Sequence, residues 1–486
     1  MKAVIIAAGR GSRLNGNGAD LPKPLVKVAG VGLLKRTILL AKRAGIREFV
    51  VVTGFRGQEV REAIASDPQV DVHIDWVENP EWELGNGRSV LKARDCVNEP
   101  FLLLMSDHLF DPQALATLRN MPVGGDEAVL CVDSRLDAIF DIDDATKVML
   151  EGDRILQIGK GLSSYNAVDT GLFLCSPYLF EALERLVAAG DDSLSSGIQE
   201  LASEGKMRAV DVGGLFWLDV DTPESLRYAE QALFQMLGKP TDGFVSRFFN
   251  RKISTRITRL LVNTPVAPNH ISLATLCISF LAAWWVASGD YLRLAMGGLL
   301  FQFASIVDGC DGEIAKLKFM GSRRGEWLDT LGDNISYLAF FIGVIYGMYR
   351  LTGETYILTL GWVVLAVDIL AVSLVLLYLQ NTGSGSIVSF NMAFSEEVPQ
   401  EKRGGFHRVF CSLKFACRRD FFAALFCVLA LANCLDTIYW IFTIGSGLIV
   451  TAIFGYSGHM LRTRGVWPTT VSNQEETEKL ASEKAD

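Results

Sequence analysis

The sequence predicts two domains of different fold class, a doubly wound α/β domain followed by an all-α membrane domain of six transmembrane helices. Three observations carry this prediction. Short apolar runs alternate with charged, glycine-containing loops up to about residue 235, whereas long apolar blocks follow from about residue 271. The mean hydropathy of +0.27, with 50% hydrophobic residues, is high for a soluble enzyme. A chain of 486 residues also exceeds what a single hydrophobic core usually holds.

The first domain, residues 1–235, is expected to consist of repeated βα units. Four short apolar runs are typical of buried parallel strands, namely Ala3–Ala8, Glu48–Thr53, Phe101–Met105 and Ala128–Val132. Helical stretches separate them, notably at Leu33–Ala44 and Arg88–Cys96. A sheet of this kind binds ligands at the carboxyl ends of its strands. No signal peptide precedes the first strand, so we expect this domain to stay in the cytoplasm.

Residues 236–264 are predicted to form a linker and an interfacial amphipathic helix. Apolar side chains between Phe244 and Leu261 interleave with five cations, Arg247, Arg251, Lys252, Arg256 and Arg259. A basic amphipathic helix with this pattern is expected to lie along the membrane surface. The alternative is an ordinary helix that packs on a domain.

Six apolar blocks make up the predicted membrane domain, residues 265–464. They run approximately over 271–288, 293–317, 326–349, 355–379, 421–434 and 437–460. Six spans are the simplest interpretation, because an apolar helix of about 20 residues crosses a bilayer. The polar tail, residues 465–486, is rich in Glu, Ser and Thr and is expected to be disordered.

The distribution of charge predicts the topology. Lys and Arg cluster before the first block, between the second and third, in the 381–420 loop and after the sixth, whereas the other three loops carry only Arg293 and Arg350. The positive-inside rule therefore places both termini and the soluble domain in the cytoplasm, and predicts a multi-pass protein of the cell inner (plasma) membrane. The net charge of −9 argues against nucleic acid as a partner, because phosphate backbones need clustered cations.

Four acidic residues, Asp308, Asp311, Asp329 and Asp333, lie between flanks that are apolar enough to span a membrane. A carboxylate at bilayer depth costs at least roughly 2.5–3.5 kcal/mol on insertion scales, so a cation should neutralise these acids. On helices, their spacing puts Asp308 beside Asp311 and Asp329 beside Asp333. Two facing pairs form a cage for hard divalent cations. Asp368, alone in the fourth block, suits either a helix–helix hydrogen bond or a polar cavity.

A second set of candidate residues lies in the first domain. The loop from Gly9 to Arg13 follows a strand, and Lys23 comes shortly after it. Glycines let a backbone approach phosphates, whose charge is met by amide hydrogens and by Lys or Arg. Asp107 follows a later strand, and Asp219 and Asp221 lie far downstream. These acids can converge at one edge of the sheet to hold Mg²⁺, although a plain strand-to-helix turn would also explain the glycines.

Taken together, these motifs resemble the sugar-phosphate nucleotidyltransferase family, in its cytidylyltransferase branch, over residues 1 to about 230. The resemblance implies a Rossmann-like domain that makes a CDP-alcohol from CTP. It implies that Lys23 is catalytic and steadies the reacting phosphates, and that Asp107, with Asp219 or Asp221, binds one Mg²⁺ or Mn²⁺. The implied loop that holds the CTP phosphates comprises Ala8, Gly9, Gly11 and Arg13.

The same resemblance implies residues for the base and for the acceptor. Asn86 and Gly87 belong to a segment similar to the one that contacts the nucleotide base. Lys160, which the resemblance also makes a catalytic candidate, and Asp169 lie in segments similar to the acceptor side of the family. A solvated surface lysine is the alternative for Lys160.

The membrane run matches the pattern DxxDGxxAR, eight residues, GxxxDxxxD of the CDP-alcohol phosphotransferase family. The resemblance covers about residues 244–460. It implies that Asp308, Asp311 and Asp329 bind two divalent cations. Asp333 is implied to accept the proton of the incoming hydroxyl while also contacting metal.

Five further positions are implied to contact the nucleotide, Asn269, Gly312, Ala315, Lys316 and Gly325. Asn269 belongs to a Pro-Asn element similar to the one that opens the family's first span. Lys316 is the one departure, because the pattern has Arg there. Lysine keeps the charge but loses the bidentate fork of Arg, so phosphate contact at this position is in doubt.

The fusion resembles a family in which an inositol-1-phosphate cytidylyltransferase is joined to a CDP-alcohol phosphotransferase of the di-myo-inositol-phosphate-phosphate synthase type. The resemblance implies that CTP and inositol 1-phosphate give CDP-inositol and pyrophosphate. Phosphoinositol is then transferred to a second inositol 1-phosphate, with release of CMP. Cations for the phosphorylated acceptor are available at Arg323, Arg324, Lys402 and Arg403, although these residues could serve topology alone.

Two alternatives remain from the sequence. One keeps the chemistry but uses a lipid alcohol as acceptor, which would make the protein a phospholipid synthase. The other is a membrane-anchored protein with only one active half. The expected partners are CTP, CDP-alcohol and phosphoalcohol substrates, membrane lipids and a second copy of the chain in a homodimer formed through the membrane domain.

Overall fold

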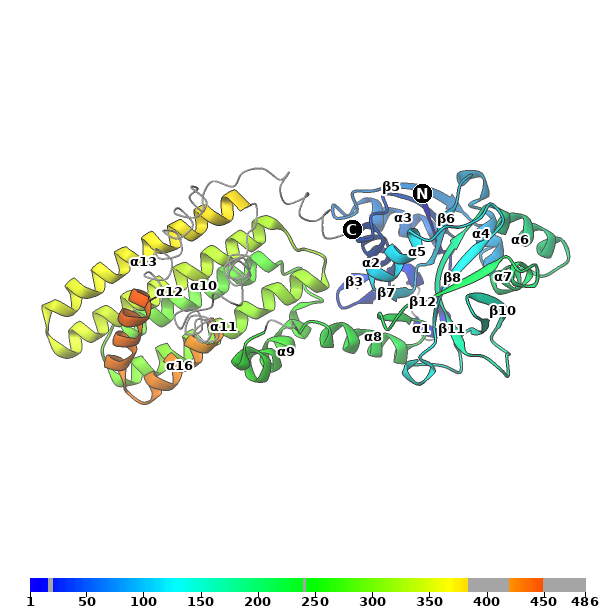
Figure 1. The fold of residues 1–486 in the computed structure, drawn as a ribbon. Helices are drawn as coiled ribbons and strands as arrows, with labels where there is room; N and C mark the ends of the chain where they lie inside the picture. The colour runs from blue at the N-terminus through cyan, green and yellow to red at the C-terminus, as the bar shows by residue number, and fades with distance from the viewer. Residues whose placement is uncertain (16–20, 239–241, 383–418, 449–486) are drawn as a thin grey trace, which may run out of the picture. The chain divides into compact units, whose positions relative to one another are not determined.

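The computed structural model describes residues 1–486 apart from 16–20, 239–241, 383–418 and 449–486 (Figure 1). The chain forms two compact units, Met1–Met236 and Leu237–Asp486. Every strand assigned among the described residues lies in the first unit, and the second unit is helical over its described part. Each unit is therefore described by itself.

A nine-stranded sheet forms the first unit, with strand order β5-β4-β1-β6-β11-β8-β12-β10-β9. Four strands at one edge, β5, β4, β1 and β6, run parallel. β11 is antiparallel to both β6 and β8, so the sheet is mixed. The four predicted runs do form strands, but the expectation of parallel neighbours is wrong where β11 is inserted. The bounds are β1 (Ala3–Ala7), β4 (Glu48–Thr53), β5 (His73–Glu78), β6 (Phe101–Met105), β8 (Ala128–Asp133), β9 (Lys147–Glu151), β10 (Arg154–Gly159), β11 (Ala167–Cys175) and β12 (Met207–Asp211).

Helices cover both faces of this sheet (Figure 1). On one side lie α2 (Leu33–Arg43), α3 (Gly57–Ala65) and α5 (Pro112–Arg119), and on the other α4 (Asn86–Leu91), α6 (Tyr178–Ala188) and α7 (Leu194–Ser203). The predicted helix over 88–96 is divided into α4 and a 3-10 turn, η2 (Arg94–Cys96). Alternate strand residues such as Val4 and Ile6 form the core with α6 and α7, because successive side chains of a strand point to opposite faces.

Two small ribbons position the loops at one edge of the sheet. β7 (His108–Phe110) pairs antiparallel with β13 (Trp217–Asp219), which sets Asp219 opposite His108. β2 (Lys27–Val28) pairs with β3 (Val31–Gly32) after α1 (Ser12–Asn15) and the 3-10 turn η1 (Lys23–Leu25). α8 (Pro223–Gln235) begins with a capping box between Thr222 and Ser225, which fixes the chain as it leaves β13.

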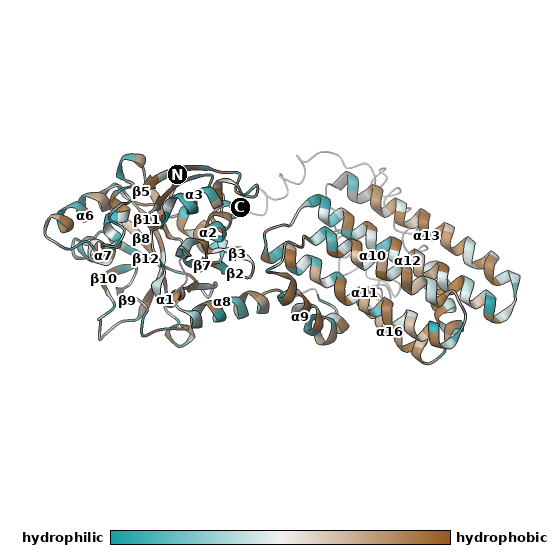
Figure 2. Ribbon diagram, turned by 180° about the vertical axis from the view of Figure 1, so that it is seen from behind, coloured by the Kyte–Doolittle hydropathy of each residue, from teal (hydrophilic) through white to brown (hydrophobic). Residues whose placement is uncertain are grey.

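The second unit is a group of long helices that are apolar over much of their length (Figure 2). Side-chain caps mark where two of them begin, because Asp290 accepts from Arg293 N and Ser322 accepts from Gly325 N. A further helix runs over 435–448. The remaining bounds are η4 (Ser246–Asn250, one π-turn), α9 (Arg251–Leu261), α10 (Pro268–Val286), α11 (Tyr291–Leu317), α12 (Arg323–Thr352), α13 (Thr355–Thr382) and α16 (Arg419–Leu431).

Close contact between α10 and α12 holds the centre of this unit together. A Cβ at Gly343 of α12 would lie 2.4 Å from the carbonyl oxygen of Ala283 in α10, so a larger residue does not fit. Small residues permit such approach between membrane helices. Phe301 of α11 stacks on Phe340 of α12 with ring centroids 4.1 Å apart.

Three described helices are long and apolar enough to cross a membrane, Pro268–Val286, Arg323–Thr352 and Thr355–Leu374. α11 is not among them, and its C-terminal part carries four charged residues. α16 is a shorter apolar helix, and the sixth predicted block continues into 449–460, outside the described residues. The prediction of six spans is therefore not confirmed. The predicted tail also lies outside the described residues.

α9 packs on another helix of the second unit, and its location on a membrane surface stays a prediction. Ser254 and Thr258 are buried, and the helix packs on α11 along this face. Lys252 and Arg256 are exposed, as is Leu260 at 78%. One face therefore packs on a domain, while the other keeps the basic and apolar side chains expected at a membrane surface.

Candidate active sites

Acidic residues from two distant segments meet at one edge of the first unit. Asp107 follows β6, and Asp219 ends β13. The N–H of Val220 donates to the carbonyl oxygen of Asp107 at 3.1 Å, so the two loops run side by side. The N–H of Asp221 donates to Ser225 Oγ at 3.0 Å, which fixes this residue before α8. The structure thus brings these three acids together, while their role as metal ligands stays a prediction.

Lys23 forms ion pairs with Asp107 and Asp221. It packs against Gly11, whose φ is +72° and where a Cβ would lie 2.8 Å from Lys23 Cβ. Burial opposes the charge of Lys23, but Asp107 and Asp221 outweigh this effect and raise its pKa. Against the effect of burial, Lys23 and His108 hold the pKa of Asp107 well below its usual value. The pair is therefore charged on both sides.

The predicted phosphate loop lies beside Lys23. Ala8 is buried, and its carbonyl oxygen accepts from Phe55 N at 3.1 Å. Gly9 is exposed, with open space where a Cβ would stand. Arg13 Nη2 lies 2.9 Å from Asp221 Oδ2. The loop is therefore open to a ligand and carries a cation at the acidic edge.

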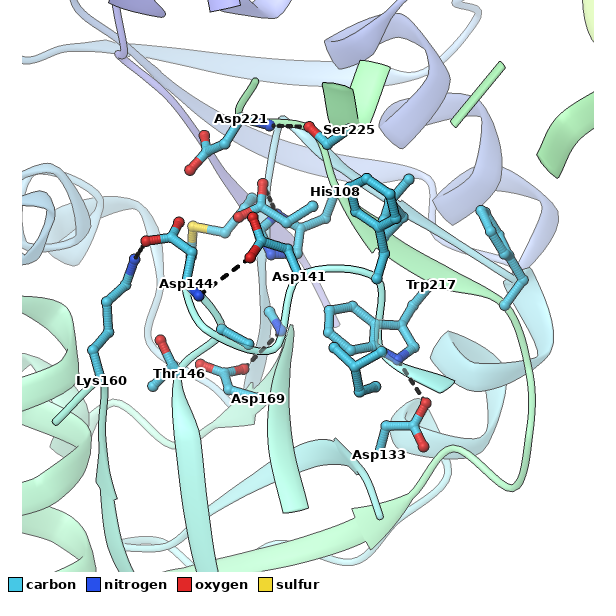
Figure 3. Close-up of a pocket in the computed structure, with 18 of the residues that line it drawn as sticks. His108, Asp133, Asp141, Asp144, Thr146, Lys160, Asp169, Trp217, Asp221 and Ser225 are labelled. Atoms are coloured by element: carbon cyan, nitrogen blue, oxygen red, sulfur yellow. Dashed lines mark hydrogen bonds and ion pairs between the residues drawn. The ribbon is translucent and has the colours of Figure 1, made fainter. Parts of the chain in front are cut away.

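A cavity of about 400 Å³ adjoins these residues (Figure 3). Asp144, which was not among the predicted site residues, accepts from Lys160 Nζ at 2.8 Å and from Arg13 Nη1 at 3.3 Å. It links the predicted acceptor lysine to the phosphate loop. Asp144 lies in the loop between η3 (Leu136–Ala138) and β9, where no motif marks it. The predicted residues that line the cavity are Asn86, Lys160, Asp169, Asp219 and Asp221.

The predicted base and acceptor residues also bond to the backbone around the cavity. Asn86 Oδ1 accepts from Leu194 N at 2.9 Å, and Gly87 N donates to the carbonyl oxygen of Asp192 at 2.9 Å. These bonds hold α4 against the start of α7. Asp169 Oδ1 accepts from Gly171 N at 2.7 Å, and burial raises the pKa of Asp169 to about 6. Their contacts with substrate stay predictions.

His108 lies among these acids and directly follows Asp107 in the chain. No role was predicted for it, although its position next to Asp107 could have indicated one. Its Nδ1 is 2.9 Å from Asp107 Oδ1 and 3.8 Å from Asp219 Oδ1. Burial works against the charged ring, yet Asp219 and Asp107 raise the pKa of His108 to about 9. Asp107, His108 and Asp219 offer ligand atoms within 4.8 Å of one another. The two carboxylates could hold a divalent cation, and His108 could join them as a ligand only after its ring loses a proton.

In the second unit, acids from two helices converge. Asp308 and Asp311 of α11 and Asp329 of α12 offer carboxylate oxygens within 4.8 Å of one another. Like charges at this distance repel, whereas a divalent cation that binds carboxylate oxygens would neutralise them. The donor set therefore fits such a cation. Asp333 lies one turn after Asp329 on α12.

The residues around this cluster come from the starts of α10 and α12 and the end of α11. Ser272 Oγ of α10 donates to Asp311 Oδ2 at 2.8 Å. A Cβ at Gly312 would meet no atom within 4 Å, whereas one at Gly325 would lie 3.9 Å from Asn269 Oδ1. Ala315 is half-buried, and Lys316 is exposed in the last turn of α11.

The predicted acceptor cations differ in what the structure describes. Arg323 and Arg324 are exposed in the first turn of α12. Lys402 and Arg403 lie outside the described residues. Asp368 of α13 accepts from Ser446 Oγ at 2.8 Å, which confirms the helix–helix hydrogen bond considered for it.

Two family models match the chain, one in each unit. The model described as a MobA-like NTP transferase domain matches residues 3–210, and the model described as CDP-alcohol phosphatidyltransferase matches residues 265–453. With the second match, the three long apolar helices indicate a membrane-associated protein.

Curated relatives match most of the chain. A protein of Rubrobacter xylanophilus, named bifunctional IPC transferase and DIPP synthase, is 41% identical over 71% of this chain and 77% of its own length. A protein of the same name from Archaeoglobus fulgidus is 37% identical over 72% of this chain and 67% of its own length. The solved inositol-1-phosphate CTP transferase from T. maritima is 30% identical, with a TM-score of 0.42, over 47% of this chain and 93% of that one.

The matches to the two curated relatives extend over both units, at an identity that marks common descent and not the fold alone. Asp107 lies within the residues that the first family model matches, while Asp219 and Asp221 follow the end of that match. The acids of the second site, Asp308, Asp311, Asp329 and Asp333, all lie within the residues that the second model matches. The chain therefore belongs to the family of bifunctional IPC transferases and DIPP synthases, and is an enzyme with a nucleotidyltransferase part and a CDP-alcohol phosphotransferase part.

Proposed function

We propose that this chain makes a phosphodiester from CTP and inositol 1-phosphate in two steps. The first step forms CDP-inositol and releases pyrophosphate. The second transfers phosphoinositol to a hydroxyl of another inositol 1-phosphate and releases CMP. The observation that carries the proposal is the presence of two separate acid clusters, one in each unit, in a chain whose relatives bear both activities in their name.

In the first step, the phosphate of inositol 1-phosphate attacks the α-phosphorus of CTP. The phosphate loop, Ala8, Gly9, Gly11 and Arg13, holds the CTP phosphates, and Lys23 neutralises charge on the reacting phosphates. Asp107, with Asp219 or Asp221, holds one Mg²⁺ or Mn²⁺. Asn86 and Gly87 contact the base. Catalysis here is mostly alignment and charge neutralisation.

Lys160 and Asp169 bind the phosphoalcohol of the first step. The cavity that they line supports this assignment, because both polar groups lie at its wall. The carboxylate of Asp169 is suited to accept hydrogen bonds from ring hydroxyls, and Lys160 to pair with the phosphate once Asp144 releases it.

In the second step, Asp308, Asp311 and Asp329 hold two divalent cations, with Asp333 as a further contact. When bound, the two cations would neutralise negative charge on the pyrophosphate linkage of CDP-inositol and on the departing CMP. Asp333 takes the proton of the attacking hydroxyl. Gly312, Ala315 and Gly325 leave room for the CDP moiety, which Asn269 and Lys316 contact. The acceptor phosphate binds Arg323, Arg324, Lys402 and Arg403.

The arrangement in the membrane belongs to the same proposal. Residues 1–235 form the cytidylyltransferase domain, 236–264 the linker and interfacial helix, 265–464 the membrane domain and 465–486 a polar tail. Six spans cross the cell inner membrane with both termini in the cytoplasm. The membrane domain contacts lipids and forms a homodimer.

The proposal is tested with purified protein in detergent micelles, incubated with CTP, Mg²⁺ and a panel of phosphoalcohols, with and without added lipid. Mass spectrometry should detect CDP-inositol from inositol 1-phosphate, and then a phosphorylated di-inositol diester with free CMP. If inositol 1-phosphate gives no CDP adduct, it is excluded as the substrate of the first step. A lipid-linked product in place of the diester would replace the proposed acceptor by a lipid alcohol.

A further inference from the structure

A buried ionic network lies behind the acids of the second unit. Glu313 of α11 is 2% exposed. Its carboxylate accepts from Arg251 Nη1 at 2.7 Å, from Ser254 Oγ at 2.6 Å and from Thr258 Oγ1 at 2.6 Å, all on α9. Arg251 also donates to both oxygens of Asp242, at 3.0 and 3.1 Å. Neither family pattern nor the proposed mechanism uses these five residues.

The packing of α9 on α11 does not by itself require buried charges. A buried ion pair loses its hydration, and apolar residues of similar volume are often as stabilising or more so. Burial opposes the charge of Arg251, but its hydrogen bonds to Asp242 and Glu313 outweigh burial and raise its pKa. A charged, geometrically specific contact is therefore maintained where an apolar contact would be sufficient for packing.

The network can control how α11 is rotated about its axis. Glu313 follows Asp311 by two residues, and at about 100° per residue it points to roughly the opposite side of the helix. Its three donors spread over two turns of α9, from Arg251 to Thr258. Cys310 Sγ, on the same side, lies 3.5 Å from the carbonyl oxygen of Ser254. Any rotation of α11 would break these contacts and also turn Asp311 away from Asp329.

We propose that Glu313 is a positioning residue for the phosphotransferase site. Bound by Arg251, Ser254 and Thr258, it fixes the rotation of α11 so that Asp308 and Asp311 converge with Asp329. The segment predicted to lie on the membrane surface is, by this inference, also a supporting part of the site. The inference rests on the proposed function, because it takes these three acids as metal ligands.

The test measures Mn²⁺ binding and turnover in full-length protein. Glu313→Gln keeps the size of the side chain and can keep hydroxyl contacts, but it removes the charge that binds Arg251. Hydrogen bonds to charged groups predict a rise of about tenfold in the half-saturating Mn²⁺ concentration for CMP release from supplied CDP-inositol, and about threefold for Ser254→Ala. Glu354→Gln, at an exposed acid of the same unit, is the matched control.

Mn²⁺ binding is also measured directly, by the EPR signal of free Mn²⁺, in an Asp107→Ala background that weakens binding to the first unit. Pyrophosphate release, measured without that background, should not change in Glu313→Gln. A merely structural role would lower the thermal stability in micelles and leave the Mn²⁺ affinity of the folded protein unchanged.

Wild-type Mn²⁺ affinity in folded Glu313→Gln would overturn the inference. If that variant does not fold, Ser254→Ala decides, and an unchanged affinity there has the same consequence. Asp308→Ala distinguishes a failure of the proposed metal site from a failure of the positioning role alone. If Asp308→Ala also binds Mn²⁺ normally, the proposed metal site itself is wrong, whereas normal binding in the Glu313 and Ser254 variants alone rejects only the positioning role.

Discussion

The two acid clusters are built in opposite ways. In the first unit, Asp107 and Asp221 come from distant segments and are already paired with Lys23. In the second unit, the acids come from two successive helices, with three carboxylates within 4.8 Å of one another. Lys23 thus offsets part of the negative charge of the first cluster. In the second cluster, the mutual repulsion of the crowded acids favours the binding of a divalent cation. Substitutions should therefore affect the two units differently.

The largest effect is expected when a crowded acid is neutralised. Asp311→Asn should lower CMP release from CDP-inositol at least about 10³-fold, because a metal-held charge is lost. Thermal stability without metal should not fall, since one of three like charges is removed and Ser272 can still donate to the amide oxygen. Asp436→Asn, at an exposed acid of the same unit, is the control. Retained CMP release would exclude Asp311 from the site.

In the first cluster, loss of the cation Lys23 should lower both the activity and the stability of the first unit. Lys23→Met should lower pyrophosphate release about 10²-fold or more. It should also destabilise the first unit by about 3 kcal/mol, because two partly buried acids lose their partner. Lys23→Arg retains the charge and should be milder in stability. Pyrophosphate assays and thermal unfolding measure the two effects, and a stable, active Lys23→Met protein would contradict the ion-pair account.

The pH dependence should also separate the units. The folded pKa of Asp169, about 6, lies above its ordinary value of 3.8. Asp169 therefore becomes protonated as the pH falls through 6, and loses its negative charge. The KM for inositol 1-phosphate should then rise about tenfold from pH 7 to pH 5. Asp169→Asn should have a high KM that varies little over this range. CMP release from supplied CDP-inositol should not follow the same profile, and a shared profile would remove Asp169 as its cause.

The smallest effect is expected at Lys316, where the family pattern has Arg. Because Lys316 is exposed, Lys316→Arg should lower the KM for CDP-inositol by no more than about threefold, through a bidentate phosphate contact. Lys252→Arg, at an exposed lysine of α9, should have no effect. A loss of CMP release in Lys316→Arg would mean that the lysine is required at this position.

The same contrast explains what could be predicted from the sequence. Helical spacing places Asp308 beside Asp311, and Asp329 beside Asp333, so each pair follows from local periodicity. The meeting of the two pairs depends on how α11 and α12 pack. Asp107 and Asp219 meet only because β7 pairs with β13, which apolar patterns do not specify. β11 was not among the four predicted strands. Its antiparallel orientation could not be predicted either, because an apolar run predicts a strand but not the orientation of its neighbours.

Residues that act through other side chains were the hardest to predict. Asp144 lies in a loop, and its partners Arg13 and Lys160 are distant in sequence. Glu313 resembles an ordinary polar residue near a helix end, and two of its donors are hydroxyls without charge. Such roles depend on which side chains are buried against each other. That is known only from the packed structure.

The central claim is that two independent sites act in sequence. Asp107→Ala and Asp333→Asn, alone and mixed, are incubated in micelles with CTP and inositol 1-phosphate. Asp107→Ala should release no pyrophosphate yet form CMP from supplied CDP-inositol, Asp333→Asn should accumulate CDP-inositol, and the mixture should make the diester. Loss of both activities in either folded variant, or a mixture without diester, would contradict the account.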